Sequence, residues 1–201
     1  MADRGRPRAF DRDAALAMAM RLFWERGYEA TSLADLKAAM GISTSSLAAA
    51  FGSKEKLFRE AVDLYVAREA AGNHRVLAAT KTAKEAVEGV LRRAVSRMVR
   101  KGEPTGCLIM LGAINTSPEN AATIDYLVAQ RRAAAEAIQN RIANGIADGD
   151  VAESADAAAL AGFYTAILKG MALSARDGAS RTELNRTVDC SMAAWDELAR
   201  V

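Results

Sequence analysis

A run of four hydroxyl side chains follows the turn Gly41-Ile42 and opens a short, otherwise apolar helix: Ser43, Thr44, Ser45 and Ser46. Hydroxyl groups both donate and accept hydrogen bonds, so such a cluster can contact base edges or phosphate oxygens of a nucleic acid. We place Leu47 and Phe51 inward as an i, i+4 pair. A rotation of about 100° per residue then turns small side chains outward, Ser45 and Ala49 directly and Ser46 and Ala48 on the flanks. Because nothing bulky projects from this face, the helix can enter a major groove.

The segment before this helix predicts a partner helix at helix-turn-helix spacing. Ser32 is a helix cap with Asp35 three positions later, and Gly41 ends the helix. Leu33, Leu36 and Met40 are expected to share one apolar face of that helix. The residues expected to fix the crossing of the two helices are Leu36, Met40, Ile42 and Leu47. This spacing also fits a small helical hairpin with a solvated face. Two basic features favour DNA, the arm Arg4, Arg6 and Arg8 before the first helix and Lys54 at the start of the fourth.

Catalytic and metal-binding patterns are missing from the sequence. His74 is the one histidine, and no HExxH, CxxC or glycine-rich phosphate loop occurs. We therefore expect no enzyme, no metal site and no cofactor. Cys107 stands at a predicted helix N-terminus, where its thiol could sense electrophiles or oxidants; the alternative is a buried, small apolar residue.

The whole sequence predicts an all-α fold of about nine helices. No segment alternates apolar and polar residues long enough for a strand. Caps and glycine stops place the helices at about 12–26, 33–40, 44–51, 54–69, 82–101, 107–114, 118–147, 154–176 and 180–200. Gly72 and Asn73 are expected to loosen the chain after the fourth helix. The domain boundary is expected along that helix, without a flexible linker, which divides the chain into 1–52 and 53–201.

Charge and composition indicate a cytoplasmic protein with no membrane association. The net charge of the 201-residue chain is +2, and residues 1–60 hold 10 Lys and Arg against 8 Asp and Glu, so an anionic partner would meet the N-terminal part. Two cysteines fit a reducing compartment. The longest uncharged stretch of the apolar C-terminal part, Ala157 to Leu168, is well short of the about 20 residues of a membrane span.

The last two predicted helices are apolar on more than one face, which indicates a second covering partner. Three small residues recur at four-residue spacing and would let a partner helix approach closely: Gly162, Ala166 and Gly170. Apolar residues of the last helix complete the predicted interface: Leu184, Val188, Met192 and Trp195. We expect a homodimer, the commonest symmetric assembly, with an ordinary monomeric core as the alternative.

The stretch "RLFWERGYEATSLADLKAAMGISTSSLAAAFGSKEKLF" resembles the N-terminal domain of the TetR family of bacterial transcriptional regulators. The resemblance rests on the aromatic end of the first helix, the Gly-Tyr-x-x-Thr-Ser link and the Phe-x-Ser-Lys-Glu-x-Leu-Phe entry to the fourth helix. It is strong over about residues 10–60. Beyond these residues the chain matches the family more loosely, by the order of its helices and by Gly106-Cys107-Leu108 at the start of one of them.

The resemblance implies roles for individual residues. Thr44, Ser45 and Ala49 would face base edges or a thymine methyl group, while the backbone side of the groove would be met by Thr31, Ser32, Ser46, Ala48 and Lys54. The family usually has tyrosine where this chain has Ala48, often touching a phosphate. An aromatic residue is also common in place of Ala50, and a small residue in place of Lys37.

The resemblance further implies a homodimeric repressor that binds palindromic operator DNA and is released by a small apolar or electrophilic inducer. The inducer pocket would lie in the domain 53–201, among these residues: Tyr65, Leu91, Met98, Cys107, Met110, Leu111, Ile114, Tyr126, Phe163, Tyr164 and Ile167. Their alternative role is plain core packing. The alternative for the whole protein is a helical ligand-binding or interaction protein without sequence-specific DNA binding.

Overall fold

The computed structural model describes residues 10–114 and 116–199, without the side chains of residues 70, 71 and 74. Within these ranges the protein is helical, which confirms the all-α prediction. The α-helices are α1 (Arg12–Arg26), α2 (Leu33–Met40), α3 (Thr44–Phe51), α4 (Lys54–Ala79), α5 (Ala83–Met98), α6 (Leu108–Leu111), α7 (Ala121–Asp148), α8 (Ala157–Arg176), α9 (Arg181–Ala193) and α10 (Trp195–Leu198), and a 3-10 helix η1 (Pro118–Asn120) precedes α7.

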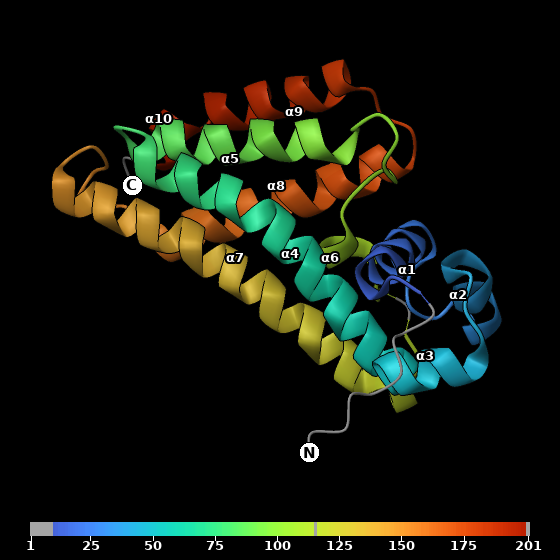
Figure 1. Ribbon diagram of the computed structural model, residues 1–201. Helices are drawn as coiled ribbons and strands as arrows, with labels where there is room; N and C mark the ends of the chain where they lie inside the picture. Colours follow the sequence, from blue (N-terminus) through green and yellow to red (C-terminus); the bar gives the residue numbers. More distant parts are fainter. Residues whose placement is uncertain (1–9, 115, 200–201) are drawn as a thin grey trace.

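Helices α1–α3 form a small domain at one end of the molecule (Figure 1). Its core is aromatic, because the ring of Phe23 on α1 meets the edge of Phe58 on α4, with centroids 5.0 Å apart. Tyr28, from the link between α1 and α2, packs on the same ring of Phe58 at 5.1 Å. The small domain is therefore held on the first turns of α4.

Helix α4 continues to Ala79 and not to about Glu69, so the prediction of its end was wrong. Gly72 does not loosen the helix but is buried within it. The guanidinium of Arg93 crosses α4 at this glycine, since a Cβ atom there would lie 1.9 Å from Arg93 Cζ. The absence of a side chain thus makes room for a cation from α5, and this favourable packing offsets the low helix propensity of glycine.

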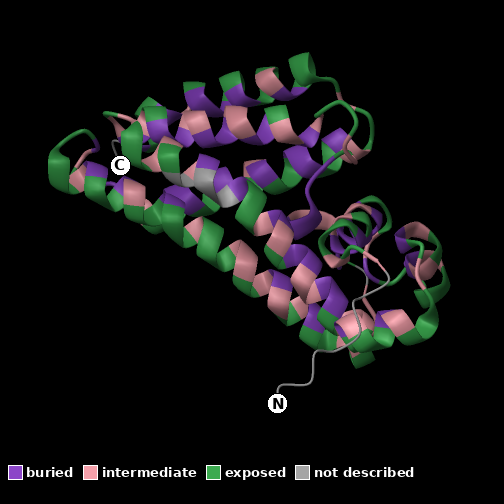
Figure 2. Ribbon diagram, in the orientation of Figure 1, coloured by how far each residue is buried: buried purple, intermediate pink, exposed green. Residues whose placement is uncertain are grey.

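The larger domain surrounds α8 with α5, α7 and α9, and its buried residues lie on the facing sides of these helices (Figure 2). Helix α4 and the 28-residue α7 run beside one another from this domain toward the small one (Figure 1). Tyr164 on α8 is fully buried and donates a hydrogen bond to the carbonyl oxygen of Ser191 on α9. Burial raises the pKa of Tyr164 to about 12, so its hydroxyl remains a donor at neutral pH.

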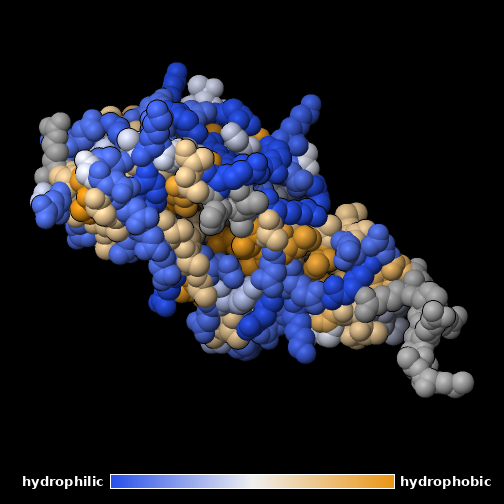
Figure 3. Space-filling model, turned by 60° about the vertical axis from the view of Figure 1, so that its left-hand side comes forward, coloured by the Kyte–Doolittle hydropathy of each residue, from blue (hydrophilic) through white to orange (hydrophobic). Residues whose placement is uncertain are grey.

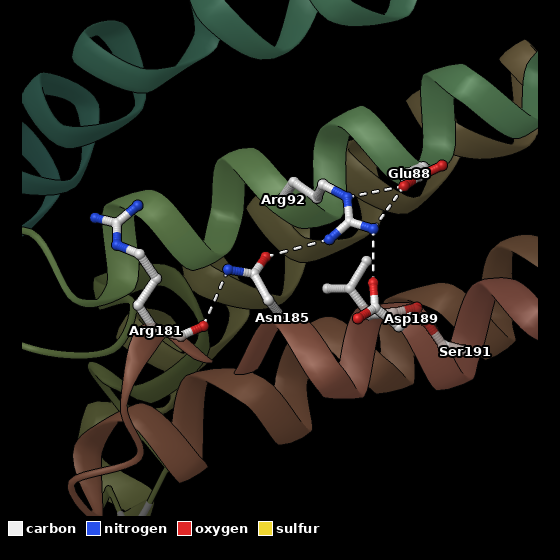
Figure 4. A network of polar contacts seen from close by, with 7 residues as sticks. Glu88, Arg92, Arg181, Asn185, Asp189 and Ser191 are labelled. Atoms are coloured by element: carbon white, nitrogen blue, oxygen red, sulfur yellow. Dashed lines mark hydrogen bonds and ion pairs between the residues drawn. The ribbon is translucent and has the colours of Figure 1, made fainter. Parts of the chain in front are cut away.

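A polar network on the surface joins α5 to α9 (Figure 4). Arg92 donates to Glu88 on its own helix and, across the gap, to Asp189 at 2.7 Å and Asn185 at 3.4 Å. The hydrogen bonds to Asp189 and Glu88 raise the pKa of Arg92. Asp189 is exposed and the other three groups are only half-buried, so the network sets the alignment of the two helices more than it adds to stability.

Several elements are shorter than the sequence predicts. Helix α6 has four residues and ends at Leu111, and the segment expected as its continuation turns away toward η1. Helix α9 ends at Ala193, and α10 begins again at Trp195, within a range predicted as one helix. Helix ends depend on contacts made after the fold forms, and local signals fix them only where a side chain caps the backbone.

Candidate nucleic-acid interface and ligand cavity

Helices α2 and α3 form the predicted helix-turn-helix. Ser32 and Asp35 make a reciprocal capping box at the start of α2, and Gly41 ends that helix in the left-handed conformation, with a φ of 65°. Ser43 then caps α3 by accepting a hydrogen bond from the backbone of Ser46. Leu36 and Leu47 are buried between the two helices. The expectation that Leu33 shares this apolar face was wrong, because 46% of its surface is exposed.

The outward face of α3 carries short side chains. Thr44, Ser45, Ala48 and Ala49 are exposed, and Ser46 is half-buried on the flank. Lys37 on α2 donates from Nζ to the hydroxyl of Thr44 at 2.9 Å. A cation therefore stands at the N-terminus of α3, where the helix dipole also favours an anion.

Arg12, which sequence reasoning missed, fixes the far end of α3. Its guanidinium donates to the carbonyl oxygen of Ala50 at 3.2 Å and to the carboxylate of Glu60 at 2.6 Å, and lies over the ring of Phe51. The contact ties α3 to both α1 and α4. No local pattern around Arg12 signals these partners, because they lie 38 to 48 positions away.

Two predicted DNA contacts have other partners in the structure. Thr31 is fully buried and its hydroxyl donates to the carbonyl oxygen of Gly27 at 2.7 Å, so it is not free to meet a phosphate. Lys54 is half-buried, with Nζ 4.2 Å from the centre of the Tyr28 ring, and burial lowers its pKa against the opposing effect of Glu29. Ser32 is exposed at the start of α2. The arm with Arg4, Arg6 and Arg8 lies outside the described residues.

A cavity of about 290 Å³ lies between α4, α5 and α7. Four residues of the predicted pocket line it: Tyr65, Met98, Cys107 and Met110. Other lining residues were not anticipated, among them Val66, Glu69, Asn73, Leu77, Arg97, Gln130 and Ile138. Figure 3 shows hydrophobic surface gathered in the middle of one face of the molecule, bordered by hydrophilic surface.

The remaining predicted pocket residues do not line this cavity: Leu91, Leu111, Ile114, Tyr126, Phe163, Tyr164 and Ile167. Leu91 and Tyr164 are core residues, while Ile114 and Phe163 are exposed. Tyr126 faces α4 on the outside, where its hydroxyl donates to Asp63. Apolar residues at helical spacing fill cores as often as they line cavities, and spacing alone does not separate the two roles.

The cavity is not purely apolar, in contrast to the expectation. Tyr65 donates from its hydroxyl to Cys107 Sγ at 3.4 Å, and both residues are buried. Burial, together with the neighbouring Cys107, raises the pKa of Tyr65 well above its ordinary value, so the phenol is neutral. Glu69 and Arg97 bring opposite charges to the same wall.

Contacts connect the cavity to the small domain. Trp24 on α1 meets Tyr65 edge to face, with ring centroids 5.0 Å apart. The backbone N–H of Tyr28 donates to the carbonyl oxygen of Gly112, directly after α6, at 2.7 Å. Arg176, the last residue of α8, donates to the carbonyl oxygens of Trp24, Glu25 and Thr105. Movement of α4, α6 or α8 would therefore displace α1.

Helix α8 presents the predicted close-approach surface. Gly162, Ala166 and Gly170 are exposed, and a Cβ atom added at either glycine would meet nothing within 4 Å. Phe163 and Leu173 beside them are 38% and 52% exposed. The four apolar residues predicted on the last helix lie inside the protomer instead, where they pack beneath this surface: Leu184, Val188, Met192 and Trp195.

By length and composition alone, α8 would also suit a membrane crossing, which the sequence analysis did not anticipate. In the described part of the chain it is the one helix that does so. About 39% of its most apolar window is buried in the protomer, where α8 packs against α5, α7 and α9. The packing is that of a core helix with one uncovered face.

Two family models match the chain. Residues 15–61 match "Bacterial regulatory proteins, tetR family", and residues 83–191 match "Tetracyclin repressor-like, C-terminal domain". The first covers the helix-turn-helix and the start of α4, and the second covers the helices around the cavity. Together they span both domains described above.

Characterised relatives and solved structures resemble the chain over nearly its whole length. The HTH-type transcriptional repressor ComR of Escherichia coli is 35% identical, with 98% of this chain and 94% of ComR covered. The repressor BdcR of the same organism is 31% identical, with 91% and 88% covered. A cysteine-substituted form of the TetR family regulator CifR, solved with 26-base-pair operator DNA, is 44% identical with a TM-score of 0.92, and 95% of this chain and all of that chain are covered. The chain therefore belongs to the TetR family and is a transcriptional regulator, not an enzyme.

Proposed function

We propose that the protein is a repressor that binds palindromic operator DNA as a homodimer and leaves it when a small molecule enters the cavity. The observation that carries the proposal is the outward face of α3, where hydroxyl and methyl groups project from a helix held firmly on α2. Such a face can lie close to base edges in a major groove. CifR, which shares this fold, was solved in complex with operator DNA, and this supports an operator-binding role for the chain.

Individual contacts follow from the exposed residues. Thr44, Ser45 and Ala49 would meet base edges or a thymine methyl group, and Ser46 and Ala48 the flanking backbone. Lys37 joins this set, since its ammonium at Thr44 can reach a phosphate with a small change of rotamer. Short hydroxyl side chains can form hydrogen bonds with more than one kind of base, so part of the sequence specificity would come from DNA shape.

The dimer would form through the uncovered face of α8. Small residues there let the partner's α8 approach closely, and Phe163 and Leu173 supply apolar surface to bury. A two-fold axis would present two α3 helices to successive major grooves, about 34 Å apart. The palindrome of the operator would mirror this symmetry.

The effector would act through α4 and the segment around α6. Both line the cavity and both contact the small domain, through Phe58 and through the hydrogen bond between Tyr28 and Gly112. A ligand that moves them changes the distance between the two α3 helices, so ligand and operator oppose each other reciprocally. We expect a small effector with an apolar body that comes within reach of Cys107, which lines the cavity, and a cytoplasmic site of action, where the operator is.

The proposal is tested by selecting bound duplexes from a randomised pool with the purified protein. The enriched duplex is then compared with a scrambled one at two salt concentrations. We expect an enriched palindrome, bound with an affinity that falls steeply as salt rises. No enrichment, together with salt-independent binding, would support an interaction protein without a DNA role.

A further inference from the structure

One cation in the cavity wall makes no ion pair among the residues that the structure describes. Arg97 on α5 lines the cavity, and its Nε atom is buried without a hydrogen-bond partner. Within the described part of the chain, the contact made by its guanidinium is with the ring of Tyr65, 5.6 Å from the centroid. Arg97 as a whole is half-buried. A partly desolvated charge without an ion-pair partner favours the binding of a group that neutralises it.

The one carboxylate among the cavity-lining residues already has two other partners. Glu69 is buried, and its two oxygens lie 3.5 Å from the guanidinium groups of Arg93 and Arg100. Two cations therefore balance one carboxylate before Arg97 is counted. The wall near Arg97 keeps an excess of positive charge.

The other polar groups near Arg97 do not remove this excess. Tyr65 is a neutral phenol whose hydrogen is directed to Cys107. Burial acts to lower the pKa of Arg97, but acidic neighbours, Glu69 among them, raise it, so the guanidinium stays charged. Arg131 places a further cation near Cys107, with its own hydrogen bond given to the carbonyl oxygen of Ile109 at 2.8 Å.

We propose that the effector is an amphiphilic anion, a small carboxylate with an apolar body, held by Arg97. The guanidinium can donate two parallel hydrogen bonds to a carboxylate. Val66, Leu77, Met98 and Ile138 line the rest of the cavity and would surround the apolar body. A volume of about 290 Å³ suits a carboxylate of roughly six to ten carbon atoms. This inference depends on the cavity being the effector site of the proposed function.

The test compares carboxylates of six to ten carbon atoms with the matching neutral amides, by titration calorimetry on the full-length protein. We expect at least one carboxylate to bind about tenfold tighter than its amide, the usual gain from one charge-assisted contact. Arg97→Gln should remove this difference, and Arg97→Lys should keep part of it. Arg132→Gln, which removes an exposed cation from the other side of α7, is the matched control and should change nothing.

The outcomes separate the inference from the function on which it depends. Equal binding of acid and amide by the wild type, or no binding of either at millimolar concentration, overturns the inference. Cys107→Ser should retain the preference for the carboxylate over the amide. If Cys107→Ser loses this preference while Arg97→Gln keeps it, the inference is also overturned. Operator binding is measured in the same preparations: a wild type that binds an operator but no carboxylate contradicts the anionic effector alone, and one that binds no operator contradicts the repressor.

Discussion

Helices α3 and α8 both present small exposed side chains, but their surroundings differ. On α3, Ala48 and Ala49 lie on the same exposed face as Ser45. On α8, Gly162 and Ala166 stand beside the exposed apolar rings and chains of that helix. Small residues let another molecule approach the backbone in both places. The neighbouring side chains then determine the partner: hydroxyl groups suit the hydrated edges of DNA, and apolar groups suit a second helix.

The largest effect is expected from a charge on the small-residue surface of α8. Ala166→Arg would place a guanidinium in the proposed dimer contact, where a buried unpaired charge costs several kcal/mol. The variant should be a folded monomer by light scattering, and its operator affinity should fall by about a hundredfold, because one half-site is bound without the other. Ala143→Arg, at an exposed position of α7, is the control. An Ala166→Arg protein that remains a dimer would contradict the assignment of this face.

A charge on α3 should separate DNA binding from assembly. Ala49→Glu points a carboxylate at the groove, and a like-charge contact of this kind costs several kcal/mol. Operator binding should disappear in a fluorescence anisotropy titration, while light scattering still reports a dimer. Ala147→Glu, exposed near the end of α7, carries the same charge elsewhere and should bind normally. Normal operator binding by Ala49→Glu would show that α3 does not enter the groove.

Restoring an aromatic residue on α3 should strengthen binding. Ala48→Tyr adds a hydroxyl that can donate to a phosphate, worth about 1 kcal/mol per protomer, or about fivefold in affinity for each half-site. Ala48→Phe has nearly the same shape without the hydroxyl. The gain should therefore appear in the tyrosine variant and be smaller in the phenylalanine variant. Equal gains would assign the effect to apolar contact.

The smallest effect concerns two of the capping boxes, that of α2 in the small domain and that of α9 in the larger one. Hydrogen bonds from Ser32 hold the pKa of Asp35 below its usual value, and hydrogen bonds from Ser180 do the same for Glu183. A carboxyl group with a lowered folded-state pKa stabilises the protein above its unfolded-state pKa, and this stability is lost as pH falls through the folded-state pKa. Asp35→Asn and Glu183→Gln should lower the Tm at pH 7, and the difference from wild type should disappear at acid pH, below the lowered folded-state pKa of each carboxyl group. A difference that persists there would exclude ionisation as its cause.

Local chemistry was predictable from the sequence, and long-range packing was not. Ser32 caps α2 as expected, and Ser43 and Ser53 cap α3 and α4 in the same way, since a cap is a contact between near neighbours in the chain. The charged wall of the cavity was missed, because Glu69 and Arg97 come together only when α4 packs on α5.

The role of Gly72 was misjudged for a similar reason. In the sequence it interrupts a helix-forming stretch, but in the fold it makes room for Arg93, which comes from a different helix. Thr31 likewise matches a DNA-contact position by resemblance. In the fold, its hydroxyl instead donates a hydrogen bond to the carbonyl oxygen of Gly27. The contacts of such residues cannot be predicted from the sequence next to them.

Helix α4 limits how this protein can be recombined with others. Its first turns give Leu57 and Phe58 to the core of the small domain, and further along it gives Tyr65 and Glu69 to the cavity. A chimaera joined at the predicted boundary after residue 52 would remove Phe58 from the aromatic core of the DNA-binding part. A sensor exchanged between relatives must therefore bring its own α4, matched to the resident α1, or be grafted beyond the end of this helix.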